Sequence, residues 1–497
     1  MIMDNPNNKK FIPENEINYI SSSLVDSTGR VFLWNNKMFR GINLSHINHI
    51  ENLFSSGLIS NLISEKLFPE SFITDFYTEK YSIVVEHKKI ETLTLPFEWS
   101  FSMLKDAALT IIKINKIAVK YRYQIKDCHS YNIVFENCVP KYIDLGGFIK
   151  VKDNDDLKSL FSYQSFKNQY IDVLKLWAAG NNIMARSLLH TFLQPRYSEF
   201  LYFKFPALRL LNPDSLNRII KKYYQFIQYC VFPDSNQSAH KLSKNLLFRI
   251  FLFIFKTIPY YFLKPEMSRL ESKLQKLNLR KIKTDWSDYN ENYFNKISEL
   301  ETLPRFAKII EYIKKFNIQS FTEFGGNCGL FAVMVNKNCS PEKYFCSDYD
   351  EYAIDFMYNR SKNDNFNLTP VLLNPLSPHI VHGAESPDVR MKTDCVIAMA
   401  LMHHLLLGQN YPIVYILKKI MSYTKKYIFI EFMPFGRYNP SESRKKNSEK
   451  PPLPEWYNID WFRAELSKYF DIIFEGETAE NRILFFGKLI TLNKYEK

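Results

Sequence analysis

Apolar positions recur along the chain with the period of two that is typical of strands or with the period of three to four that is typical of amphipathic helices. The elements expected up to residue 150 are a β-hairpin (30–34 and 37–42), a helix (55–68), a strand (81–87), a longer helix (99–118) and two short strands (133–135 and 141–145). Ser100 stands at the start of the longer helix and is expected to cap it. The first part of the chain is therefore predicted to be an α+β domain.

The rest of the chain changes character twice. Residues 155–263 have a helical pattern, and residues 266–285 are charged and read as a linker. From Trp286 onward helices alternate with apolar runs, which predicts a doubly wound sheet. The seven strands expected there are 320–324, 343–348, 369–373, 394–400, 427–432, 471–476 and 482–489, the last two forming a closing hairpin. The fold class is α/β, and the domain boundaries predicted are 1–265, a linker at 266–285, and 286–497.

Composition agrees with two folded domains. The chain has 497 residues, too many for one ordinary domain, and its 46% hydrophobic residues exclude a disordered or fibrous protein. Its 65 Lys+Arg against 52 Asp+Glu give a net charge of +13. A basic surface of this kind attracts phosphate groups or anionic lipid, but no block of basic residues dominates, so nucleic acid is not the favoured partner.

The cysteines and the apolar segments indicate where in the cell the protein is expected. The seven Cys form no CxxC pair and no metal-ligand spacing with the histidines, which predicts no metal site and a reducing, cytoplasmic compartment. The N-terminus lacks the apolar stretch of a signal peptide. Leu246–Leu263 is the most apolar stretch, but Arg249, Lys256 and Pro259 interrupt it. We therefore expect a buried helix or a membrane-surface contact at 246–263 and no transmembrane segment.

One turn concentrates unusual chemistry. Gly325, Gly326 and Gly329 directly follow the strand that ends near Glu323, although the chain has only 14 Gly. A strand, a glycine turn and a helix let the backbone approach a ligand closely. The next strand ends at Asp348, where a carboxylate in a doubly wound sheet can accept hydrogen bonds from ribose hydroxyls.

These features, with the strand count and the terminal hairpin, resemble the class I S-adenosylmethionine-dependent methyltransferases. The resemblance implies S-adenosylmethionine as the cofactor. The residues it places at the cofactor are Glu323, Gly325, Gly326, Asn327 and Gly329 along the methionine and ribose, Asp348 at the ribose, and Asn374 near the adenine. A nicotinamide enzyme is the competing interpretation, and it is disfavoured because the turn is not GxGxxG and because of the terminal hairpin.

Within that superfamily, residues 286–490 resemble the methyltransferase part of proteins related to the rhizobial nodulation host-specificity protein NoeA. The residues that carry this resemblance are Trp286, Asp288, Tyr289, the glycine turn, Leu372–Pro375, Ala400–Leu405 and Ile430–Phe432. His403 and His404 follow the fourth strand, where this fold presents the methyl acceptor. A histidine of ordinary pKa near 6.5 could take a proton from an acceptor hydroxyl, so both are candidate catalytic residues. The segment 434–457 is a candidate acceptor lid.

A second constellation lies in the N-terminal part. Asp127, then Asn132 five positions later, then Asp144 opening a D-x-G, resemble the catalytic and metal-binding loops of kinases. The resemblance implies that Asp127 takes a proton from a hydroxyl while Asn132 and Asp144 hold Mg²⁺ on ATP. ATP and Mg²⁺ are therefore further candidate ligands. Similar N-terminal parts, including the run 96–106, accompany the methyltransferase in the same branch.

The kinase signature is incomplete. Gly29 stands alone where a glycine-rich loop would cover the phosphates, and Lys37 or Arg40 with Glu65 are the only candidates for the lysine–glutamate pair. An active kinase, a pseudokinase that binds a nucleotide or acceptor, and a structural remnant all stay open.

The function predicted is methyl transfer to an oxygen of a saccharide, a glycan precursor or a small molecule. The alternatives are a phosphotransferase acting through the N-terminal domain, a nucleic-acid methyltransferase, and a scaffold without catalysis. The phosphotransferase would need Asp144, the nucleic-acid enzyme would concentrate basic residues at the glycine turn, and the scaffold would bind neither nucleotide.

Overall fold

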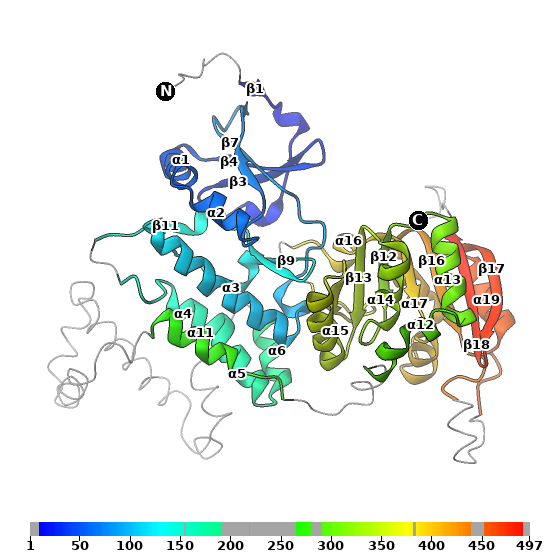
Figure 1. Ribbon diagram of the computed structural model, residues 1–497. Helices are drawn as coiled ribbons and strands as arrows, with labels where there is room; N and C mark the ends of the chain where they lie inside the picture. The colour runs from blue at the N-terminus through cyan, green and yellow to red at the C-terminus, as the bar shows by residue number, and fades with distance from the viewer. Residues whose placement is uncertain are drawn as a thin grey trace.

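The computed structural model describes residues 9–153, 156–190, 218, 265–280, 291–380, 384–438 and 452–490. Residues 9–280 are called the N-terminal half below, and residues 291–490 the C-terminal half. Figure 1 shows the two halves side by side, the first coloured blue to green and the second green to red.

A five-stranded antiparallel sheet begins the N-terminal half, with the order β2-β3-β4-β7-β5. Its strands are β2 (Asn18–Tyr19), β3 (Gly29–Trp34), β4 (Lys37–Ile42), β5 (Ser71–Ile73) and β7 (Val84–His87). The predicted hairpin is confirmed as β3 and β4, joined by Asn35 and Asn36 with φ of 48° and 59°. Two consecutive left-handed residues are what a tight hairpin turn requires, and asparagine tolerates them better than most residues. A short parallel pair, β1 (Lys10–Phe11) and β6 (Phe76–Tyr77), lies beside this sheet.

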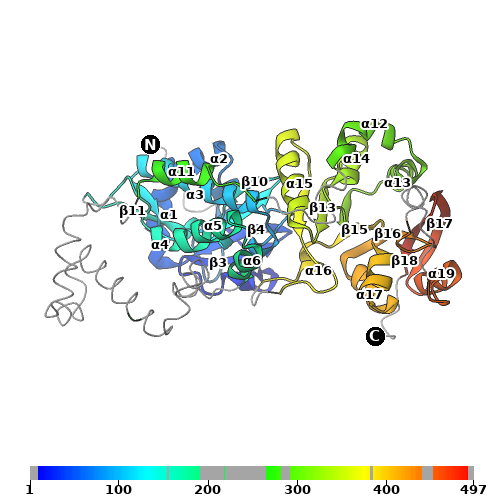
Figure 2. The same ribbon diagram turned by 90° about the horizontal axis from the view of Figure 1, so that it is seen from below.

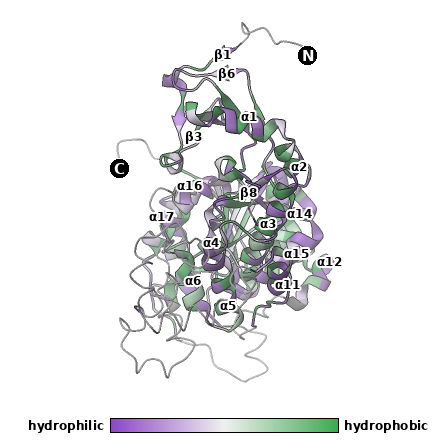
Figure 3. Ribbon diagram, turned by 90° about the vertical axis from the view of Figure 1, so that its left-hand side faces the viewer, coloured by the Kyte–Doolittle hydropathy of each residue, from purple (hydrophilic) through white to green (hydrophobic). Residues whose placement is uncertain are grey.

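Helices build the rest of the N-terminal half around α3 (Phe101–Lys120). Ser100 caps α3 as predicted, its hydroxyl accepting a hydrogen bond from the backbone N–H of Met103. The other helices are α1 (Ile47–Ser55), α2 (Leu58–Ser64), α4 (Tyr163–Phe166), α5 (Asp172–Ala178), α6 (Asn182–His190) and α11 (Met267–Gln275). Figure 3 shows both hydrophobic and hydrophilic residues along these helices, as expected where one face of each is buried.

Helix α11 changes the interpretation of the predicted linker. Met267, Leu270 and Leu274 are buried in the same hydrophobic core as α3, so residues 267–275 belong to the N-terminal half. The charges of this segment lie on the exposed face of a helix, and a pattern dominated by charge hid its apolar face. The domain boundaries predicted at 265 and 286 adjoin or fall among residues outside those described.

Two short antiparallel ribbons follow α3. They are β8 (Tyr123–Ile125) with β11 (Phe148–Lys150), and β9 (Ile133–Glu136) with β10 (Val139–Tyr142). The loop from β8 to β9 carries Asp127 and Asn132, and the turn after β10 carries Asp144.

The C-terminal half contains a seven-stranded sheet of order β14-β13-β12-β15-β16-β18-β17, in which β18 alone is antiparallel to its neighbours. Its strands are β12 (Ser320–Phe324), β13 (Lys343–Asp348), β14 (Thr369–Leu372), β15 (Thr393–Ala398), β16 (Thr424–Phe432), β17 (Phe470–Ala479) and β18 (Arg482–Leu489). All seven predicted strands and the closing hairpin are confirmed. The chain order reverses between β12 and β15, and ligands of such sheets bind at this switch point.

Helices cover both faces of this sheet (Figure 2). One core packs α13 (Pro304–Lys315), α14 (Leu330–Cys339) and α15 (Glu351–Asp364) on one face, and a second core packs α17 (Ile413–Tyr423) and α19 (Ile459–Ser467) on the other. The short helices α12 (Ile297–Leu300) and α16 (Pro387–Arg390) complete this half. The turns after β12, β13, β14 and β15 meet at one edge of the sheet because these strands are parallel neighbours.

Candidate functional site

The glycine turn after β12 has a strained backbone that few residues could adopt. Gly325, Asn327 and Gly329 have φ of 66°, 52° and 79°, in the left-handed region. Gly329 is the N-cap of α14, so the turn leads directly into a helix whose first N–H groups lie at the sheet edge. Gly326 is required for a different reason, because a Cβ on it would lie 2.3 Å from Sγ of Cys346 on β13.

Glu323 lies beneath this turn rather than on its surface. Its carboxylate accepts hydrogen bonds from the Tyr344 hydroxyl at 2.8 Å and from the Cys346 thiol at 3.3 Å, and its side chain is 3% exposed. Burial raises the pKa of Glu323 to about 7, although both hydrogen bonds oppose the rise. The structure thus places Glu323 as a buried support of the turn, and its contact with the cofactor stays a prediction.

Asp348 lies at the end of β13, beside the glycine turn. Oδ2 of Asp348 accepts a hydrogen bond from the backbone N–H of Asn327 at 2.8 Å, and Oδ1 accepts one from Asp350 N–H at 2.9 Å. Burial raises the pKa of Asp348, and these backbone donors oppose the rise. A carboxylate can accept about four hydrogen bonds, so acceptor capacity remains on Asp348.

Strand register decides on which face the two acidic side chains lie. Glu323 is opposite Cys346 in the parallel pair of β12 and β13, and Asp348 follows Cys346 by two residues. Side chains alternate along a strand, so Glu323 and Asp348 lie on the same face of the sheet. The charge of Asp348 also contributes to the raised pKa of Glu323, which agrees with that placement.

Asn374 lies just beyond the carboxyl end of β14, an outermost strand of the sheet, which pairs with β13. Its Oδ1 accepts a hydrogen bond from Leu376 N–H at 3.1 Å, and Leu373 N–H donates to the carbonyl oxygen of Asp348 at 3.0 Å. The loop after β14 is therefore tied to the end of β13. The structure brings Asn374 to the same edge as Asp348 and the glycine turn.

A buried ion cluster marks the end of β16, and the sequence prediction missed its role. Glu431 is fully buried and accepts two hydrogen bonds from Arg305, at 2.6 and 2.9 Å, and one from Arg482 at 3.1 Å. Burial raises the pKa of Glu431, but the two guanidinium groups outweigh burial and lower it. Glu431 also accepts the backbone N–H of Ala400, which has φ of 51° in the turn after β15. A carboxylate inside an apolar strand must be paired, and this was the signal that could have revealed the cluster.

The two histidines lie beside this cluster, but their protonation differs from the prediction. His403 is 5% exposed, and burial lowers its pKa to about 3, with the charges of His404 and Arg482 adding to the effect. His404 is less buried, and burial followed by the charge of Arg437 lowers its pKa as well. The expected pKa near 6.5 is therefore wrong for both, because the sequence could not reveal their burial. Their ring centroids are 4.0 Å apart.

Several predictions fall wholly or partly outside the described residues. Trp286, Asp288 and Tyr289 lie there, as does the apolar segment 246–263. Of the candidate acceptor lid at 434–457, residues 439–451 also lie there.

The kinase-like residues come together at one end of the N-terminal half. Asp127 is exposed, and the carbonyl of Asn132 accepts the backbone N–H of Ile143, next to Asp144. Burial raises the pKa of Asp144, while the charge of Arg40 lowers it and the charge of Asp127 raises it further. The three predicted residues are thus neighbours, as the resemblance implies.

The expected lysine–glutamate pair is wrong. Arg40 forms an ion pair with Asp26, and Lys37 pairs with Glu86, whereas Glu65 pairs with Lys113 on α3.

The segment before β3 also lies close to the D-x-G turn. A Cβ on Gly146 would lie 1.9 Å from Oγ1 of Thr28, so this segment packs directly on the turn that Asp144 opens. Asp26 and its partner Arg40 also lie close enough for their charges to act on Asp144.

Among the residues that the structure describes, no three His, Cys, Asp or Glu side chains gather closely enough to hold a metal ion. None of the helices in this part of the chain has the length and apolar character needed to cross a bilayer.

The strand order defines the class of the C-terminal half. A sheet in which the third, second, first, fourth, fifth, seventh and sixth strands lie side by side, with the seventh antiparallel, is the fold of the class I S-adenosylmethionine-dependent methyltransferases. The left-handed turn after its first strand and the carboxylate of Asp348 at the end of its second strand lie side by side.

The sequence comparison adds a homologue. The chain is 22% identical to the nodulation protein NoeA of Rhizobium meliloti (strain 1021) over 507 residues, which cover 96% of each chain. The similarity to NoeA therefore runs through both halves of the chain. No protein-family model matches the sequence.

Solved structures were also compared. A SAM-dependent methyltransferase from Aquifex aeolicus is 13% identical, with 40% of this chain and 98% of that chain covered and a TM-score of 0.28. Magnesium protoporphyrin IX methyltransferase from Synechocystis PCC 6803, with bound SAH, is 11% identical, with 45% and 94% covered and a TM-score of 0.29. The fold assignment rests on the strand order and not on these alignments.

Proposed function

We propose that the protein transfers a methyl group from S-adenosylmethionine to an oxygen atom of its acceptor. The observation that carries this proposal is the position of Asp348, whose carboxylate is held by backbone N–H groups at the end of the second strand and keeps acceptor capacity for ribose hydroxyls. The left-handed turn at Gly325 and Gly329 lies beside it, so the residues present fit this cofactor.

The roles of the remaining site residues follow from their contacts. Asn327 orients Asp348 through its backbone N–H, and Asn374 lies at the adenine side of the same edge. Glu323 and Gly326 support the turn from within the core. The Arg305–Glu431–Arg482 cluster fixes the Ala400 backbone, where the acceptor side begins.

When bound, S-adenosylmethionine supplies an electrophilic methyl group on a sulfonium. Transfer of that group to an acceptor oxygen would mainly require that the two reactants are aligned, and Asp348 with the turn at Gly325 and Gly329 would hold the donor for it. The acceptor hydroxyl must also lose its proton. We propose that His404 rather than His403 accepts this proton. His404 is less buried, and both rings are neutral at cellular pH.

We further propose that the N-terminal half is a kinase-like module without phosphotransfer activity. Its sheet order and the neighbouring Asp127, Asn132 and Asp144 support the kinase-like fold. The pairing of Arg40 with Asp26 and the contact of Thr28 with Gly146 argue against a phosphate cradle for ATP and Mg²⁺. A phosphotransferase that acts through this half is thus the less favoured alternative function.

The proposed acceptor is a saccharide, a glycan precursor or a small molecule. Two features support that class: the homologue is a nodulation protein, and a kinase-like module of the kind that acts on sugars precedes the methyltransferase fold. Nucleic acid is less favoured, because no block of basic residues dominates the sequence.

Calorimetry with S-adenosylhomocysteine on the full chain tests the proposal. Asp348→Ala should weaken binding by about 1.5–3 kcal/mol, or roughly 10- to 150-fold in Kd, because charge-assisted hydrogen bonds to the ribose are lost. The exposed Asp471 offers a matched control, Asp471→Ala, which should bind like the unaltered protein. An Asp348→Ala protein of normal fold and unchanged Kd would contradict the assignment, and ATP binding that depends on Asp144 would favour the phosphotransferase.

A further inference from the structure

The run 96–106, which the function proposed above leaves without a role, lies at the contact between the two halves. It contains the short helix η5 (Pro96–Glu98) and the first residues of α3. Glu98, Ser102 and Asp106 all bond to residues of the C-terminal half. The contacts therefore extend over three successive turns of this segment.

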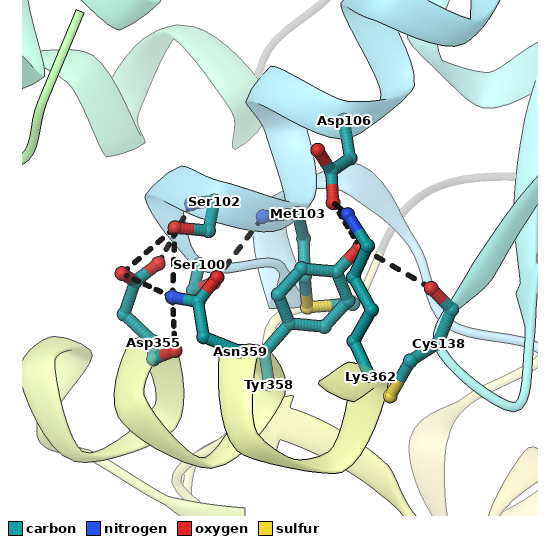
Figure 4. Close-up of polar contacts among 9 residues, drawn as sticks. All are labelled: Ser100, Ser102, Met103, Asp106, Cys138, Asp355, Tyr358, Asn359 and Lys362. Atoms are coloured by element: carbon teal, nitrogen blue, oxygen red, sulfur yellow. Dashed lines mark hydrogen bonds and ion pairs between the residues drawn. The ribbon is translucent and has the colours of Figure 1, made fainter. Parts of the chain in front are cut away.

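The first contact joins Ser102 to helix α15. The Ser102 backbone N–H donates to Oδ1 of Asp355 at 2.7 Å, and its hydroxyl donates to Oδ2 at 2.9 Å. Asn359, one turn later on α15, donates to the Ser102 hydroxyl at 3.1 Å (Figure 4). Asp355 thus places a carboxylate at the N-terminus of α3, where the helix dipole favours negative charge.

The second contact lies one turn further along both helices. Tyr358 is fully buried, and its hydroxyl donates to Asp106 at 2.7 Å, as Lys362 does at 2.5 Å (Figure 4). Asp355, Tyr358 and Lys362 are spaced three and four residues apart, so they share one face of α15. That face of α15 packs against the N-terminal half, and Tyr358 is part of the hydrophobic core of the N-terminal half.

The third contact holds the first residue of α15. The Glu351 carboxylate accepts hydrogen bonds from Trp177 Nε1 at 2.8 Å and from Asn182 Nδ2 at 2.9 Å, and it pairs with Arg186 at 3.3 Å. All three partners belong to α5 and α6 of the N-terminal half. Glu351 is therefore held in place by residues of the N-terminal half.

The neighbouring loop after β14 is held in the same way. Arg390 forms a fully buried ion pair with Glu98 at 2.5 Å and donates to the Leu93 carbonyl at 2.8 Å. The rings of Phe97 and His379 meet edge to face at 4.8 Å. The N-terminal half thus also holds the segment that leads into β15.

Asp350 connects Glu351 to Asp348, the residue proposed to bind the ribose. Asp350 caps α15 by accepting the backbone N–H groups of Tyr352 and Ala353, and its own N–H donates to Asp348. Glu351 is the next residue after that cap. A shift of the start of α15 would therefore move the N–H group that holds the Asp348 carboxylate.

We propose that the N-terminal half positions the Asp348 carboxylate of the proposed cofactor site, with Glu351 and Asp355 as positioning residues. This inference rests on the proposed function, since it assigns a regulator to the same cofactor site. The kinase-like module then fixes the position of α15. The affinity of the protein for S-adenosylmethionine therefore depends on contacts with residues more than 160 positions earlier in the chain.

The test measures S-adenosylhomocysteine binding by calorimetry on full-length variants. Glu351→Ala and Asp355→Ala should each weaken binding by about tenfold, within the range typical of coupling between sites. Glu351→Gln keeps an oxygen that can accept from Trp177 and should recover most of the affinity. Asp364 lies exposed at the end of the same helix, so Asp364→Ala is the matched control and should leave binding unchanged.

A thermodynamic cycle separates positioning from general destabilisation. If Glu351 acts through Asp348, then Glu351→Ala should cost less affinity in an Asp348→Ala background than in the unaltered chain. Equal losses in both backgrounds, or a normal Kd for both single variants despite a lower melting temperature, would overturn the inference alone. Absence of S-adenosylhomocysteine binding by the unaltered protein would instead overturn the proposed function.

Discussion

At the scale of single residues, burial accounts for the chemistry of the site better than residue type does. Glu323 and Asp348 are both acids at strand ends, yet one is enclosed in the core and the other lies at the edge with backbone donors on it. His403 shows the same effect, because burial lowers its pKa to about 3 and removes it as a base near neutral pH.

Glu323 should make stability depend on pH. Its pKa rises from 4.5 in the unfolded chain to about 7 in the folded protein, so the folded state binds more protons between those values. The stability that the protonated form contributes is present below pH 4.5 and is lost as the pH rises through about 7. Glu323→Gln should therefore gain stability relative to the unaltered protein on going from pH 5 to pH 8, by up to about 3 kcal/mol.

Urea unfolding of both proteins at the two pH values measures this difference. If the difference in the free energy of unfolding between the two proteins did not change with pH, the pKa of Glu323 would be the same in the folded and the unfolded chain. Tyr344→Phe is a useful companion, since it removes the hydroxyl that donates to Glu323 without adding charge.

At the scale of elements, the strands and helices were largely predictable and their partners were not. The hairpin around Asn35, the cap at Ser100 and all seven strands of the large sheet follow from local pattern and turn chemistry. Helix α11 was missed, because its three buried residues are spread among charges. The Arg305–Glu431–Arg482 cluster joins a helix and two strands that are far apart in the chain, which no local pattern reveals.

The glycine turn supplies a prediction at this scale. Gly326→Ala should destabilise the protein by about 1–3 kcal/mol, because its Cβ would lie 2.3 Å from the Cys346 sulfur in a packed core. Cys346→Ala removes that sulfur, so the double variant should be less destabilised than the sum of the two single changes. Thermal and urea unfolding of the three variants measure the coupling, and strict additivity would mean that the turn does not press on β13.

At the scale of the whole molecule, the two halves share more than a covalent connection. Ion pairs, hydrogen bonds and a buried tyrosine join α3 to α15, and the Glu98–Arg390 pair adds a contact at helix α16. A desolvated ion pair is costly when one partner is removed, so contacts of this kind fix the relative position of what they join. The similarity to NoeA likewise runs through both halves.

The most direct test of the account is a crystal structure of the full chain with S-adenosylhomocysteine. The account predicts that both ribose hydroxyl oxygens lie within about 3.2 Å of the Asp348 carboxylate, with the methionine part against the turn at 325–329. A ligand bound elsewhere on the chain, or a ribose held without Asp348, would contradict the central claim.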